Sequence, residues 1–122
     1  MVKSYRYLLI WQRAMELAEV VYEATTKLPA RESHGLTSQL QRAAVSVPSN
    51  IAEGHAREST REYLRSLRTS RGSLAEIETQ LLLCERLQLL CADDIAHSMK
   101  ISDDLGKMIR GVQRSLNEKL TS

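Results

Sequence analysis

The sequence predicts an all-α protein that folds as an antiparallel up-down four-helix bundle, in a single domain spanning residues 1–122. Four segments repeat apolar residues at spacings of three and four, which is the period of an amphipathic helix. The connections expected between them are about two to six residues long, so neighbouring helices must be antiparallel. No segment alternates apolar and polar residues as a strand does. One alternative keeps the helices but arranges them as two hairpins that pack together only when copies of the chain associate.

The first predicted helix covers about residues 5–28 and ends before Pro29. Its expected buried row is Leu8, Trp11, Met15, Ala18, Tyr22 and Thr25.

The second predicted helix begins after a Ser33 cap and stops near Gly54, where glycine gives the chain an easy exit. Pro48 lies inside it and has no N–H to donate to residue 44, so we expect a bend there. The apolar row of this helix is Leu36, Leu40, Ala43, Val47 and Ile51. A second, polar row follows on another face and consists of Arg42, Ser46, Asn50 and Glu53. Packing alone does not require this polar row.

The third predicted helix begins at Ser59, which forms a capping box with Glu62, and it runs to about residue 90. Its apolar row is Tyr63, Leu67, Ser70, Leu74, Ile77, Leu81 and Cys84. Gly72 and Ser73 in mid-helix cost about 1 kcal/mol relative to alanine, which suggests close approach of another helix or subunit. Asp93 or Asp94 then caps the fourth helix. The row of that helix is Ile95, Met99, Leu105, Met108 or Ile109, Val112 and Leu116.

The composition is that of a soluble globular chain, with 43% hydrophobic and 26% charged residues. The N-terminal residues lack the features of a secretory signal, and no apolar run approaches the roughly 20 residues that span a bilayer. Cys84 and Cys91 lie about 10.5 Å apart along one helix, too far for a disulfide, so we expect thiols in the core. These features predict a cytoplasmic protein.

The run Ser46-Val47-Pro48-Ser49-Asn50-Ile51-Ala52-Glu53-Gly54 resembles the 23S rRNA-intervening sequence proteins. Leu8, Trp11 and Ala14 before it and residues 72–79 after it extend the resemblance over most of the chain, although Tyr5, Ser66 and Thr69 depart from the family pattern. The resemblance implies a four-helix bundle that forms a ring-like homo-oligomer, typically a pentamer, with no enzymatic activity. It also implies nucleic acid and a reverse transcriptase as partners of some relatives.

Basic side chains gather near two helix ends that an antiparallel bundle brings together. Residues 57–71 carry a net charge of +3 from five basic and two acidic side chains, and residues 107–122 carry +3 from four and one. Residues 72–106 carry −5 from two basic and seven acidic side chains. The residues predicted to bind nucleic-acid phosphates are Arg57, Arg61, Arg65, Arg68, Arg71, Lys107, Arg110 and Arg114. The alternative is a solvated face in which Glu58 pairs with Arg61 and Glu62 with Arg65.

The polar row of the second helix is interpreted as a structural or interface motif. The motif consists of this row together with Pro48 and Gly54, that is, Arg42, Ser46, Pro48, Asn50, Glu53 and Gly54. This face lacks a nucleophile with an aligned base, and no histidine lies within helical reach on it, so we expect no catalytic site. The three histidines are scattered without metal-ligand spacing, and no glycine-rich phosphate loop occurs, so no metal or cofactor is predicted.

These observations predict a non-enzymatic, oligomeric bundle whose basic end binds the phosphates of RNA or DNA without reading sequence. A scaffold that docks a protein such as a reverse transcriptase is the alternative.

Overall fold

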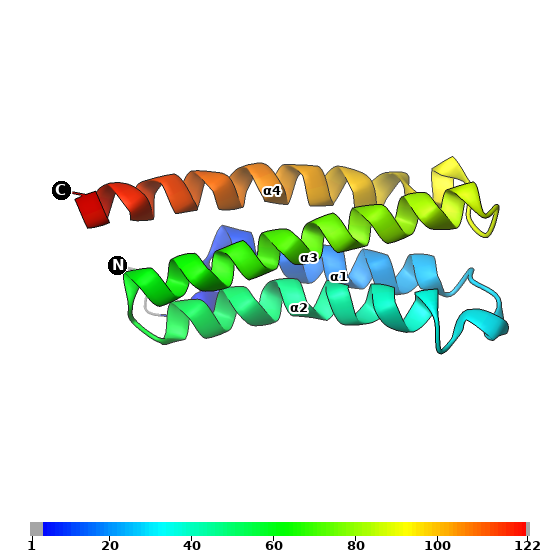
Figure 1. Ribbon diagram of the computed structural model, residues 1–122, viewed down its shortest axis with the longest axis horizontal. Helices are drawn as coiled ribbons and strands as arrows, with labels where there is room; N and C mark the ends of the chain where they lie inside the picture. Colours follow the sequence, from blue (N-terminus) through cyan, green and yellow to red (C-terminus); the bar gives the residue numbers. More distant parts are fainter. Residues whose placement is uncertain (1–3, 122) are drawn as a thin grey trace.

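The computed structural model describes residues 4–121 and consists of four long helices and two short ones. A 3₁₀ helix, η1 (Tyr5–Tyr7), precedes α1 (Leu9–Thr25), and a second, η2 (Ala30–Glu32), precedes α2 (Leu36–Ala56). The two longest elements follow, α3 (Thr60–Arg86) and α4 (Ala92–Thr121). Successive long helices run in opposite directions along one elongated bundle (Figure 1).

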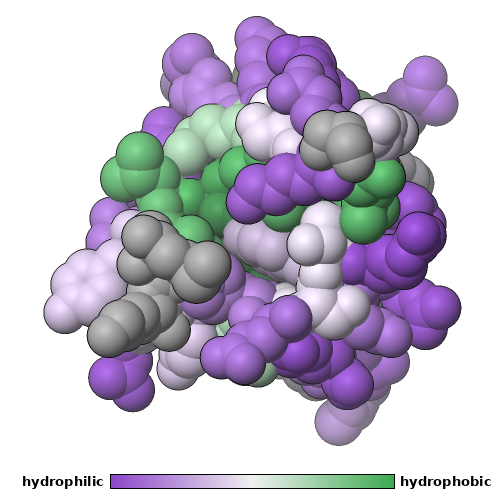
Figure 2. All heavy atoms as spheres, turned by 90° about the vertical axis from the view of Figure 1, so that its left-hand side faces the viewer, coloured by the Kyte–Doolittle hydropathy of each residue, from purple (hydrophilic) through white to green (hydrophobic). Residues whose placement is uncertain are grey.

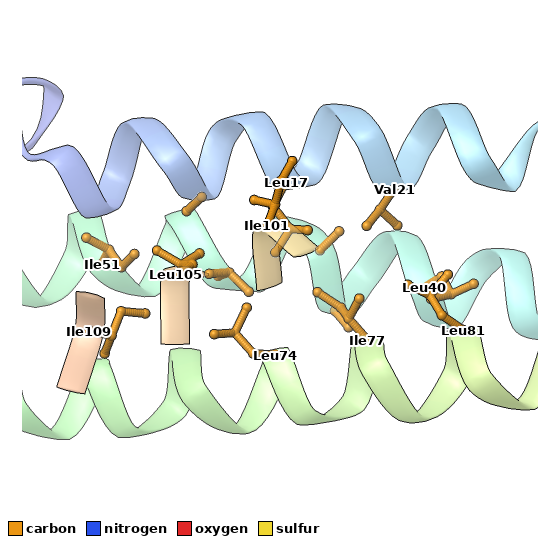
Figure 3. Close-up of a cluster of buried hydrophobic side chains, with 14 of the residues drawn as sticks. Leu17, Val21, Leu40, Ile51, Leu74, Ile77, Leu81, Ile101, Leu105 and Ile109 are labelled. Carbon is orange, nitrogen blue, oxygen red and sulfur yellow. The ribbon is translucent and has the colours of Figure 1, made fainter. Parts of the chain in front are cut away.

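One apolar core runs along the bundle and receives side chains from every long helix. Figure 3 shows Leu17 of α1, Ile51 of α2, Leu74 of α3 and Leu105 of α4 pointing into the same space. Leu17, Ile51 and Leu105 have no solvent exposure, and Leu74 has 3%. Because a single chain completes this core, the predicted four-helix bundle is confirmed and the alternative of two separate hairpins is wrong.

The buried face of α1 differs from the predicted one. Ile10, Ala14, Leu17 and Val21 enter the core, whereas the predicted core residues Met15 and Tyr22 are exposed. Two neighbouring faces of this helix carry apolar residues at helical spacing, and the sequence pattern does not show which one meets the core. Leu8, Trp11 and Ala18 of the predicted row still pack against the edge of the core and Thr25 is buried, so only Met15 and Tyr22 of this row lie on the outside of the bundle. The helix also begins later than predicted, since η1 occupies the first turn.

Both predicted ends of α2 require correction. Gly35 rather than Ser33 occupies the N-cap position, and the Glu32 carboxylate accepts a hydrogen bond from the Leu36 amide at 3.3 Å. At the other end the helix continues past Gly54 to Ala56, and the residue with left-handed backbone is Glu58, at φ 56°. Gly54 therefore serves a purpose other than ending the helix.

That purpose is close contact between α2 and α3. An ideal Cβ at Gly54 would lie 2.5 Å from the Ser66 Cβ and 3.3 Å from the Tyr63 Cα. Only glycine allows α3 to approach so near. Gly72 behaves differently, because nothing lies within 4 Å of the position that a Cβ would take there and the residue is exposed. The predicted approach of another helix is therefore wrong for Gly72 but confirmed for Ser73, which is buried and hydrogen-bonded to Ser46 of α2 at 2.9 Å.

Caps start the last two helices. The Ser59 hydroxyl accepts a hydrogen bond from the Glu62 amide at 3.3 Å, which confirms the predicted N-cap of α3. Asp94 accepts from the Cys91 amide at 2.9 Å, just ahead of the first turn of α4. Cys84 is buried as predicted, but Cys91 is exposed in this connection because α3 already ends at Arg86.

No helix within residues 4–121 combines the length and apolar character that crossing a bilayer would require.

Candidate functional site

The start of α3 and the end of α4 lie together at one end of the bundle, on the left of Figure 1. The two helices are joined there by a hydrogen bond from Arg71 Nη1 to Gln113 Oε1 at 3.2 Å. We call this region the basic end and define it by the predicted phosphate-binding residues: Arg57, Arg61, Arg65, Arg68, Arg71, Lys107, Arg110 and Arg114. Figure 2 views the molecule from this side and shows hydrophilic side chains around a partly apolar middle.

A shallow groove of about 420 Å³ separates α3 from α4 at the basic end. Three guanidinium groups line it, from Arg71, Arg110 and Arg114, together with the amides of Gln113 and Asn117, the Thr121 hydroxyl and one carboxylate, that of Glu118, so positive charge is in excess. Arginine presents five N–H donors in a planar fork that fits phosphate oxygens, and side-chain amides add further donors. The lining therefore suits an anion that has several acceptor oxygens.

A row of three arginines continues this surface along the outer face of α3. Arg61, Arg65 and Arg68 are exposed, and helical geometry spaces the first two about 6 Å apart along the axis. None of the three forms an ion pair with another residue among positions 4–121. The alternative pairing with Glu58 and Glu62 does not occur, and the left-handed backbone of Glu58 places that residue outside the helix.

Two members of the basic end do have acidic neighbours. Arg57 lies 3.8 Å from Glu53, and Lys107 lies 3.2 Å from Asp103. Both pairs link residues four apart on exposed surface, where solvent screening leaves an ion pair worth less than about 1 kcal/mol. Arg110 and Arg114 are exposed and have no ion-pair partner in the described part of the chain. The unpaired charge is thus concentrated in the groove and the α3 row.

The polar row of α2 is used inside the molecule. Asn50 Nδ2 donates to the Ser46 carbonyl at 2.8 Å and to the Ser46 hydroxyl at 2.9 Å, and that hydroxyl bonds with the one of Ser73 on α3 at 2.9 Å. Ser70 adds a bond to the Val47 carbonyl at 3.0 Å. Helix α2 remains unbroken through Pro48. These bonds attach α3 to the segment of α2 that Pro48 deprives of an N–H donor.

The remaining polar residues of this row stay on the surface. Arg42 is exposed, and Glu53 faces solvent beside Arg57. Within residues 4–121 no three His, Cys, Asp or Glu side chains come together in a way that could hold a metal ion.

Acidic groups occupy the opposite end of the bundle, where α3 leads into α4. Asp94 forms an ion pair with Lys27 of α1 at 2.7 Å. This bond and the hydrogen bond from the Cys91 amide lower the pKa of Asp94 from 3.8 to about 2. Negative charge in the first turn of α4 is also favoured by the helix dipole. The separation of charge between the two ends therefore agrees with the sequence prediction.

The lowered pKa of Asp94 gives a testable acid dependence. Its carboxylate has a lower pKa when folded than when unfolded, so its stabilising contribution is present above pH 3.8 and is lost as the pH falls toward 2. We expect Asp94→Asn to lower the free energy of unfolding near neutral pH and to flatten its decline over this acidic range. Urea denaturation across a pH series measures both effects. Asp93→Asn is the matched control, and identical profiles for the two variants would contradict the assignment.

Sequence reasoning missed four polar residues of the groove, Gln113, Asn117, Glu118 and Thr121. Gln113 is 8% exposed and lies next to Val112 in the apolar row of α4. A glutamine on a buried helix face was the sequence feature that could have identified it. Asn117 lies one turn further on and gave no such signal.

Comparison with known proteins gives a family match. A model of the 23S rRNA-intervening sequence protein family matches residues 6–111. A comparison with curated proteins finds no match. The matched region contains α1, α2, α3 and most of α4 but stops before Gln113, Arg114 and Asn117. Part of the groove thus lies outside the region that the family shares.

Proposed function

The chain belongs to the 23S rRNA-intervening sequence protein family, and from this premise and its charge distribution we propose that it is a non-enzymatic bundle that associates with nucleic acid. Its basic end contacts the backbone phosphates of RNA or DNA in the cytoplasm. The observation that carries the proposal is a set of five exposed arginines at one end that have no ion-pair partner within residues 4–121: Arg61, Arg65, Arg68, Arg110 and Arg114.

Unpaired surface charge at one pole is costly for a folded chain, because like charges repel one another. Ion pairs with nearby acidic side chains would offset this repulsion, yet Glu58 and Glu62 do not pair with the arginine row of α3. A polyanion supplies the missing negative charge. Each phosphate that an arginine neutralises releases condensed counterions, which favours binding.

The chemistry of the groove argues for contact with the backbone rather than with bases. Guanidinium groups on two antiparallel helices face one shallow channel, and the amides of Gln113 and Asn117 lie between them. No aromatic side chain lines the channel to stack on an unpaired base. Contacts of this kind position a strand without carrying sequence information. The proposed binding is therefore independent of sequence.

Assembly is the second part of the proposal. Copies of the chain form a homo-oligomer, a pentamer according to the family resemblance, with their basic ends on one side. Several basic ends on one rim would raise the local positive potential and provide multivalent attachment to a single nucleic acid.

A salt series tests the binding proposal. If five arginines contact five phosphates, the logarithm of the binding constant should fall with the logarithm of salt at a slope of about −4.5, or roughly 500-fold between about 50 and 200 mM salt. Fluorescence anisotropy with labelled structured RNA and duplex DNA of unrelated sequences measures this slope. Similar affinities across sequences are expected. Absence of binding at the lowest salt would overturn the proposal in favour of the alternative, a protein-only scaffold that docks a partner such as a reverse transcriptase.

A further inference from the structure

An apolar groove lies on the outside of the bundle beside α1. It has a volume of about 530 Å³, and Met15, Ala18 and Tyr22 form its apolar wall, with Gln41 of α2 on the other side. Met15 and Tyr22 keep 39% and 44% of their surface exposed. These residues belong to the row that the sequence predicted as core. A second apolar face on a helix that already has a buried face is typical of an interaction surface.

A leucine patch lies on the last part of α3 and consists of Leu82, Leu83 and Leu87. Their exposed fractions are 45%, 42% and 54%. Large apolar side chains rarely cluster on a surface without a partner to cover them. The three leucines are exposed side chains on a helix surface, whereas Met15 and Tyr22 line a shallow recess.

Charged residues beside the two surfaces have opposite signs. Glu19 and Glu23 line the α1 groove, and Arg86 stands between Leu83 and Leu87. All three are exposed, and none forms an ion pair among residues 4–121. Acidic groups beside the α1 groove and a basic group beside the leucine patch are complementary in charge.

The two surfaces also lie at the same end of the bundle. The groove follows the later part of α1 and the leucine patch the later part of α3, and both helices finish on the right of Figure 1. They come from different helices and point in different directions, so the chain cannot bring them together by itself. A second copy of the chain can bring its leucine patch to the α1 groove of the first copy.

We propose that the leucine patch of one copy packs into the α1 groove of the next, with Arg86 placed between Glu19 and Glu23. Such a contact is heterologous, because two different patches meet, and repeating it yields either a closed ring or a filament. Because both surfaces lie in the same half of the bundle, they meet at the same height when adjacent copies stand side by side with the same orientation, and we place the copies in that arrangement. Their basic ends then share one rim. The inference rests on the oligomer in the proposed function and supplies its interface.

Charge exchange tests the contact in the full-length chain. Arg86→Glu alone should weaken assembly at least tenfold, and so should the pair Glu19→Arg with Glu23→Arg. All three substitutions in one chain reverse the charge on both sides of the contact and should restore assembly. Sedimentation velocity and light scattering at micromolar concentration measure the oligomer, with Arg31→Glu, an exposed residue outside both surfaces, as the control of equal charge change. Circular dichroism checks the fold of each variant, whose substituted residues are all exposed.

Three results would overturn the interface. These are a wild-type chain that stays monomeric, an oligomer that Arg86→Glu leaves intact, and a triple variant that fails to reassemble. An oligomer that tolerates Arg86→Glu but is broken by Tyr22→Asp would indicate a groove-to-groove dimer instead. Measuring RNA binding by the same samples separates this inference from the proposed function. Assembly that responds to the charge exchange without RNA binding supports the interface and contradicts the nucleic-acid proposal.

Discussion

Reversing two charges in the α3–α4 groove, with Arg110→Glu and Arg114→Glu, should lower affinity for structured RNA by about 100-fold or more at roughly 100 mM salt. The substitutions remove two phosphate contacts and place two carboxylates where phosphates would lie. Each lost contact also reduces the salt slope by about 1, so the slope should become shallower by about 2. Both arginines are exposed and unpaired, so the fold should not change. Anisotropy titrations at several salt concentrations measure both quantities.

The matched control reverses two other exposed arginines. Arg31 precedes α2 at the opposite end of the bundle, and Arg42 lies on α2. Arg31→Glu with Arg42→Glu changes the net charge of the chain by the same amount, so any general effect of charge appears in both pairs. The control variant should retain most of the affinity for RNA, and the dependence of that affinity on salt should be nearly unchanged. Equal losses in the two pairs would show that net charge acts without a localised site, and would contradict the groove.

The second large effect is on stability and comes from Gly54. Alanine there would place a Cβ 2.5 Å from the Ser66 Cβ and 3.3 Å from the Tyr63 Cα, and the backbone contact cannot be relieved by rotating a side chain. Helices α2 and α3 must move apart, and the hydrogen bond between Ser46 and Ser73 would lengthen with them. We expect Gly54→Ala to lower the free energy of unfolding by about 1–3 kcal/mol, the usual cost of overpacking. Urea denaturation at a fixed protein concentration measures it.

Gly72→Ala is the matched control for this prediction. No atom lies within 4 Å of the position its Cβ would take, and the residue is exposed in the middle of α3. Alanine should therefore stabilise the protein by up to about 1 kcal/mol through helix propensity alone. Ser66→Gly should relieve part of the damage done by Gly54→Ala, since it removes the Cβ that the new methyl group meets. Equal behaviour of Gly54→Ala and Gly72→Ala would contradict the close approach of the two helices.

Helix number and order were predictable because each long helix has an apolar row at helical spacing. For α3 and α4 nearly every predicted row residue is at least partly buried, and the Ser59 cap is at its predicted place. The choice of face on α1 was not predictable. Met15 and Tyr22 continue a helical spacing of non-charged side chains just as Ala14 and Val21 do, and only the positions of the other helices decide which of them are covered. The predicted role of Gly54 in ending α2 was wrong for a related reason. Its glycine is explained by a contact with a distant residue and not by local chain geometry.

The candidate site was predictable only in outline. Antiparallel packing implied that the +3 segments at residues 57–71 and 107–122 would meet, and the hydrogen bond between Arg71 and Gln113 agrees. The pairing state of each arginine depends on side-chain geometry that the sequence does not contain. The left-handed turn at Glu58 removes one acidic residue from the helix, and Glu62 at the capped end of α3 forms no ion pair with Arg65. The groove itself needed Gln113 and Asn117, which the charge pattern does not include.

The most direct test of nucleic-acid contact at the basic end is arginine protection. Phenylglyoxal modifies accessible guanidinium groups, and mass spectrometry measures the rate at each arginine with and without saturating structured RNA. If RNA contacts the basic end, it should strongly slow the modification of Arg65, Arg68, Arg110 and Arg114 and change the rates at Arg31 and Arg42 little. Equal protection at all arginines, or protection confined to Arg31 and Arg42, would contradict it.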